Sequence, residues 1–76
     1  MTPQFYNKNK DLSMYGLMCG YVQEKKKGER YKRIFMEHEH LHIQSGINGQ
    51  HCQVWETFDK DQLTKARSFF NNIKIN

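Results

Sequence analysis

The chain has 76 residues, which corresponds to one small domain, and its five phenylalanines, four tyrosines and one tryptophan argue against full disorder. Its formal net charge is +4, and much of the positive charge lies in residues 25–33, KKKGERYKR, which favours an anionic partner. The N-terminus lacks the apolar stretch of a signal peptide, and no segment approaches the ~20 apolar residues of a membrane span, so we expect a cytoplasmic protein with reduced cysteines.

The first third of the sequence predicts an arm, a strand and a turn. Residues 1–11, MTPQFYNKNKD, are polar and indicate a flexible N-terminal arm, and residues 12–76 then form a single domain. Residues 12–23, LSMYGLMCGYVQ, predict the first strand, because both of its faces are fairly apolar, as in a strand covered on each side. A turn is expected at residues 24–29, where Gly28 can adopt a positive φ.

Three of the four histidines lie at alternate positions in the next segment. Residues 30–44, RYKRIFMEHEHLHIQ, predict one long second strand. Because side chains alternate between the two faces of a strand, His38, His40 and His42 would form a row on one face, and Leu41 would point to the other.

The strongest hairpin signal is Asn48-Gly49, since both residues tolerate the positive φ of a type I′ turn. It precedes a third predicted strand at residues 51–58, HCQVWETF. If the loop consists of these two residues alone, counting outward pairs Trp55 with His42 and places the tryptophan on the histidine face.

A helix is predicted after the third strand. Asp59 is a suitable N-cap, and Gln62 three residues later completes a capping-box pattern. Apolar residues then recur at helical spacing at Leu63, Ala66, Phe70 and Ile73. The expected fold is α+β, a three-stranded antiparallel β-meander with one C-terminal helix packed on one face. The histidine face would stay open, or be covered by the N-terminal arm or by a second copy of the chain.

The uncovered face is the candidate partner-binding surface, because aromatic residues are enriched at protein interfaces. We expect a protein partner, self-association included, and no catalytic role. An ordinary half-exposed strand, with the tryptophan packed over the histidines, explains the same pattern equally well. The residues assigned to this surface are His38, His40, His42, Trp55, His51 and Gln53.

Nucleic-acid binding is the first alternative. The basic segment would contact phosphates while the aromatic and histidine face stacks bases, although no known RNA-binding motif is present. A lysine run of this kind is more often a solvated loop tip than a binding site. The residues assigned to anion binding are Lys25, Lys26, Lys27, Arg30, Lys32 and Arg33.

Two further alternatives concern the histidines alone. A small ribonuclease could use His40 and His42 as general base and general acid, flanked by Lys32 and Arg33. A metal site is less favoured, because alternate strand residues lie roughly 7 Å apart and no CxxC or HExxH spacing is present. We therefore predict no metal and no cofactor.

Three segments together resemble small accessory proteins of bacteriophages. They are the Asn- and Lys-rich residues 7–10, the lysine run 25–27 and the strand–cap–helix ending 54–70. Such proteins are short, single-domain chains, often with a small antiparallel sheet and one helix. The resemblance implies a role in inhibiting a host enzyme or defence system, in the cytoplasm of a bacterial host, by binding that system or its nucleic acid. It assigns no individual residue a function.

Overall fold

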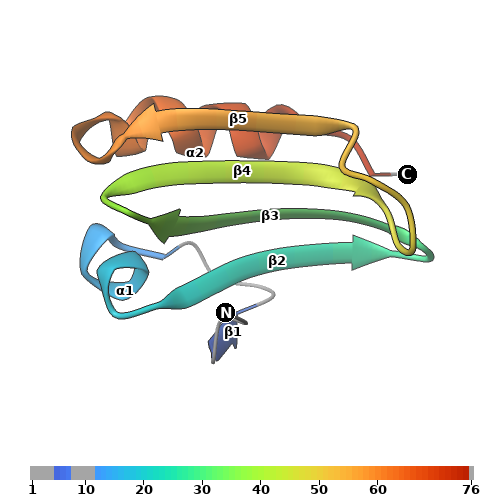
Figure 1. Ribbon diagram of the computed structural model, residues 1–76, viewed down its shortest axis with the longest axis horizontal. Helices are drawn as coiled ribbons and strands as arrows, with labels where there is room; N and C mark the ends of the chain where they lie inside the picture. The colour runs from blue at the N-terminus through green and yellow to red at the C-terminus, as the bar shows by residue number, and fades with distance from the viewer. Residues whose placement is uncertain (1–4, 8–11, 76) are drawn as a thin grey trace.

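The computed structural model describes residues 5–7 and 12–75 (Figure 1). Its elements, in chain order, are β1 (Phe5–Asn7), α1 (Met14–Met18), β2 (Tyr21–Lys27), β3 (Arg30–Glu37), β4 (His40–Ile47), β5 (Val54–Asp59), the 3-10 turn η1 (Lys60–Gln62) and α2 (Leu63–Asn72). Strands β2 to β5 form an antiparallel meander, and β1 pairs in parallel with β2 at one edge of the sheet.

The α+β class and the C-terminal helix packed on an antiparallel sheet are confirmed, but the meander has four strands where three were predicted. The prediction also lacked the short helix α1. Most of the predicted arm, residues 1–4 and 8–11, lies outside the described residues, and residues 5–7 of it form β1. Within the described part of the chain, no helix is long and apolar enough to cross a membrane.

The strand predicted at residues 12–23 was wrong in its first half, which forms α1. Ser13 caps this helix, because its hydroxyl accepts a hydrogen bond from the Gly16 amide at 3.2 Å. Leu17 is 1% exposed and joins the core. Gly20, at φ 94°, lets the chain leave the helix and enter β2. A helix of five residues is too short to show a helical apolar period in the sequence.

Two tight turns replace one predicted turn and part of one predicted strand. The turn expected at residues 24–29 shortens to two residues beginning at Gly28, whose φ is 62°. The strand expected at residues 30–44 was wrong, because the chain folds back at His38 and Glu39, with φ values of 53° and 64°. Two consecutive positive φ values match a type I′ turn, which usually carries Asn-Gly. His38 therefore lies at a hairpin tip and leaves the predicted histidine row.

The β4–β5 register also differs from the prediction. Asn48-Gly49 does form a turn, but only Gly49 has a positive φ, at 85°, so the predicted type I′ turn is wrong, and the connection continues through residue 53 before β5 begins. As a result His42 pairs with Thr57, two residues beyond the predicted partner Trp55. A displacement of two residues keeps every side chain on its face, since the strand period is two. The prediction that Trp55 and His42 share a face is therefore confirmed.

The core lies on one face of the sheet, between the strands and both α-helices. Arg67 on α2 donates a hydrogen bond to the Leu12 carbonyl, which ties α2 to the segment before α1. The buried apolar residues of this core are Leu12, Leu17, Ile34, Leu41, Ile43, Ala66 and Phe70. Val22 and Tyr31 are also buried but lie outside this cluster. We call this side of the sheet the helix face. The opposite side, which carries His40, His42 and Trp55, is the open face.

Candidate functional site

The open face carries an aromatic cluster formed by Phe35, His42 and Trp55, one residue from each of three neighbouring strands. The His42 ring stacks on Phe35, with ring centroids 5.4 Å apart and an interplanar angle of 16°. Trp55 meets the same imidazole edge-on at 6.2 Å, and its indole nitrogen donates a hydrogen bond to His42 Nδ1 at 3.2 Å. The Trp55 side chain is nevertheless 59% exposed, so the cluster is ordered and still accessible.

His42 orients this cluster through both ring nitrogens. Since Nδ1 accepts the indole hydrogen bond, the ring proton must lie on Nε2. Nε2 in turn lies 3.3 Å from the Glu37 carbonyl, to which it can donate. The neutral tautomer protonated on Nε2 therefore satisfies both contacts at once and fixes the ring between Phe35 and Trp55.

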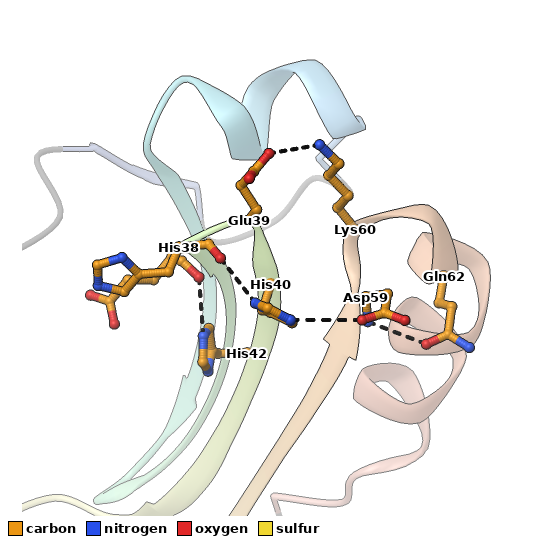
Figure 2. Close-up of polar contacts among 8 residues, drawn as sticks. His38, Glu39, His40, His42, Asp59, Lys60 and Gln62 are labelled. Atoms are coloured by element: carbon orange, nitrogen blue, oxygen red, sulfur yellow. Dashed lines mark hydrogen bonds and ion pairs between the residues drawn. The ribbon is translucent and has the colours of Figure 1, made fainter.

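The β3–β4 turn beside the cluster holds two non-glycine residues, His38 and Glu39, in the left-handed region. This conformation costs roughly 1–2 kcal/mol per residue. Two contacts support it: the Glu39 carboxylate pairs with Lys60 Nζ at 2.7 Å, and His40 Nδ1 donates to the His38 carbonyl at 2.9 Å (Figure 2). Retained strain of this kind concentrates at functional sites.

The ion pair at this turn affects the ionisation of both partners. The hydrogen bond and charge of Lys60 lower the pKa of Glu39, and the same contact raises the pKa of Lys60. On the same side of the turn, His40 Nε2 lies 3.7 Å from a carboxylate oxygen of Asp59 (Figure 2). The turn is thus joined to the β5–η1 junction by two contacts between charged or titratable groups.

The three imidazoles of the predicted row do not act as one set. Figure 2 shows the His38 ring pointing away from those of His40 and His42. Among the described residues, no group of three or more histidine, cysteine, aspartate or glutamate side chains is placed to hold a metal ion. The ribonuclease alternative receives no geometric support either, because both nitrogens of His40 and of His42 already have contacts and Lys32 lies on the helix face.

The other two residues assigned to this surface, His51 and Gln53, lie in the loop before β5, and both are exposed. This loop folds back onto β3, where Cys52 Sγ lies 3.3 Å from the Tyr31 hydroxyl. The hydrogen bond with Cys52, followed by burial, raises the pKa of Tyr31. The structure therefore places His51 and Gln53 in a loop that packs on β3, outside the strand that carries Trp55.

The basic residues divide between the two faces, because they alternate along β2 and β3. Lys26 and Arg33 lie on the open face, each 3.9 Å from an oxygen of Glu24. The others lie on the helix face, where the strand register pairs them across β2 and β3 as Lys25 with Lys32 and Lys27 with Arg30. The six residues that the sequence suggested as one anion-binding set are thus two separate groups.

Lys32 is 5% exposed, and its contacts are with other parts of the fold. Its ammonium donates to the carbonyls of Phe70 at 2.8 Å and Ile73 at 3.1 Å, at the C-terminal end of α2. It also lies 4.6 Å from the centroid of the Phe70 ring. Burial, followed by the charges of Lys25 and Lys74, lowers the pKa of Lys32. A ligand on the surface could not reach this ammonium without displacing the helix end.

The sequence-based assignment missed Phe35 and Glu37, which flank His42 on β3. Both positions follow once the chain is known to fold back at His38 and Glu39, because that register pairs Phe35 with His42. This turn could not be recognised in the sequence, because it contains no glycine, asparagine or proline.

Comparisons of this chain with protein-family models, with curated proteins and with solved structures gave no match.

Proposed function

We propose that this protein is a small, non-enzymatic binding protein that inhibits or modulates a protein partner, which it contacts through the open face. The observation that carries the proposal is Trp55, which is 59% exposed yet held by a hydrogen bond and an edge-on ring contact to His42. Tryptophan is among the residues that most often dominate binding energy at interfaces. Because its orientation is set before binding, less side-chain entropy is lost when a partner docks.

The charges on the open face favour a protein over a nucleic acid at this surface. The cations Lys26 and Arg33 both lie near Glu24, which partly neutralises them. The carboxylates of Glu37 and Asp59 also lie on this face, on the β-strands that flank β4. These would repel phosphates and attract a cation. We therefore expect the partner to offer an apolar pocket for the indole beside a lysine or arginine.

The strained β3–β4 turn supports the same surface. His38 and Glu39 occupy positions where Asn-Gly would fold without strain, and both are exposed next to the carboxylates. A turn that keeps larger side chains at this cost presents an imidazole and a carboxylate to a partner. The likeness of the chain to small phage accessory proteins supports an inhibitory role for such binding.

Capture from a bacterial lysate tests the proposal when it is made dependent on Trp55. The immobilised full chain should retain a specific protein after nuclease treatment, and Trp55→Ala should weaken its binding by at least ~30-fold, as expected for an interface hot spot. Tyr15→Ala is the matched control, because Tyr15 is a 78% exposed aromatic residue on α1. Capture that is lost with Tyr15→Ala and kept with Trp55→Ala would contradict the proposal, and so would the absence of any nuclease-resistant protein.

A further inference from the structure

The hairpin formed by β2 and β3 holds like charges against one another on the helix face. Its register places Lys25 opposite Lys32 and Lys27 opposite Arg30. Like charges directly opposite on antiparallel strands are destabilising. Lys74, beyond the end of α2, adds to them, because burial, followed by the charges of Lys25 and Lys74, lowers the pKa of Lys32. The fold therefore gathers positive charges on this face although their mutual repulsion is destabilising.

Carboxylate partners distinguish this group from the basic residues of the open face and of the contact at the β3–β4 turn. On the open face Lys26 and Arg33 each lie 3.9 Å from Glu24, and Lys60 pairs with Glu39 at 2.7 Å. Within the described residues, no such ion pair exists for four exposed or half-exposed cations that lie on the helix face at the β2–β3 hairpin or beyond the end of α2. We call these four the cationic array: Lys25, Lys27, Arg30 and Lys74.

The end of helix α2 does not account for the array. Helix C-termini attract cations through their unpaired carbonyls and the helix dipole. Here Lys32 already occupies that position, with hydrogen bonds to the carbonyls of Phe70 and Ile73 at 2.8 and 3.1 Å. The carbonyls at the end of α2 are therefore already bonded by Lys32 and do not need the charges of the array. These charges remain available to an external anion.

We propose that the cationic array binds the phosphate backbone of a nucleic acid, on a surface separate from the open face. Strands β2 and β3 hold three of these cations, Lys25, Lys27 and Arg30, on one face, and several cations held together match the repeated charge of a polynucleotide better than a single phosphate. Lysine and arginine contacts to phosphate position the chain without reading bases, so binding is independent of sequence. The protein would then bind a nucleic acid on one face of the sheet and a protein on the other.

Fluorescence anisotropy of a labelled single-stranded thymidine oligonucleotide, titrated with the full chain over a salt series, tests this inference. Four contacts on a single strand predict that log K falls with log salt at a slope of about −3, and Lys27→Ala should reduce that slope by about 0.7. Lys25→Ala combined with Lys27→Ala should reduce it by about 1.4 and should not lower thermal stability, because repulsion is relieved.

Lys26→Ala is the matched control, because Lys26 lies between the two array residues on β2 and points to the open face. It should leave oligonucleotide binding unchanged. No binding at low salt, or an equal loss with Lys26→Ala, would overturn the inference. Poly-glutamate should compete weakly, and competition as strong as that of unlabelled oligonucleotide would assign the array to an acidic protein surface instead. Trp55→Ala should bind the oligonucleotide as the wild type does, so failure of the array and failure of the protein-binding face are distinguishable.

Discussion

The two faces of the sheet use polar side chains in opposite ways. On the helix face the ammonium of Lys32 is buried against α2 and completes the packing by bonding two helix carbonyls. On the open face His42 orients Trp55 and leaves most of the indole in solvent. Since neighbouring residues of one strand point to opposite faces, the same strands can hold a core on one side and an accessible surface on the other. Polar contacts therefore stabilise the fold on one face and arrange an exposed side chain on the other.

The largest change in the free energy of unfolding is expected from Lys32→Met on the helix face. Lys26→Met on the open face is its control. The substitution keeps the aliphatic stem of Lys32 but leaves the Phe70 and Ile73 carbonyls without their donor. We expect the free energy of unfolding, measured with urea, to fall by about 1–3 kcal/mol. Lys26→Met should change it little, because exposed ion pairs contribute ~0–1 kcal/mol. A Lys32→Met variant as stable as the wild type would show that burying the charge outweighs its contacts.

A smaller effect of opposite sign is expected at the β3–β4 turn. Replacing His38 and Glu39 together by Asn and Gly should raise the free energy of unfolding by about 1–2 kcal/mol, because the left-handed conformation costs non-glycine residues roughly that much each and the Lys60 contact is lost in exchange. Gly28→Ala, at φ 62°, should lower stability by about 1 kcal/mol. Unchanged or reduced stability of the Asn-Gly variant would mean that the native contacts fully relieve the turn.

The smallest effect concerns the exposed Glu39–Lys60 ion pair. Lys60 lowers the pKa of Glu39 below its ordinary value of 4.5, so this pair adds stability above that pH and the contribution is lost as the pH falls through the folded-state pKa. An NMR titration of the Glu39 carboxyl should show its pKa rising toward the ordinary value in Lys60→Met. A pKa that does not move in Lys60→Met would contradict the contact.

Some features of the fold could be predicted because they depend on neighbours in the chain. The Asp59 amide donates to Gln62 Oε1 at 3.2 Å, as the capping-box pattern indicates, and the following residues form η1 and α2. Trp55 and His42 share a face because strand periodicity survives a register displacement of two residues. Ala66 and Phe70, predicted from helical spacing, are fully buried.

The features that could not be predicted depend on contacts between distant residues. Nothing in the local sequence favours a positive φ at His38 and Glu39, and the chain folds back there because pairing of β3 with β4 and the Lys60 contact outweigh the local cost. The same holds for Lys32, whose charge in the sequence suggests an exposed residue.

Alternation, the helix cap and the Asn48-Gly49 turn were therefore set by the amino-acid sequence alone, since each involves residues only a few positions apart. The number of strands, the partner of His42 and the division of the basic residues between two faces were set by tertiary packing. These three features share one physical reason, because each depends on where the chain reverses direction. The reversal at His38 and Glu39 is stabilised by the pairing of the strands it joins, although its own residues disfavour the positive φ values.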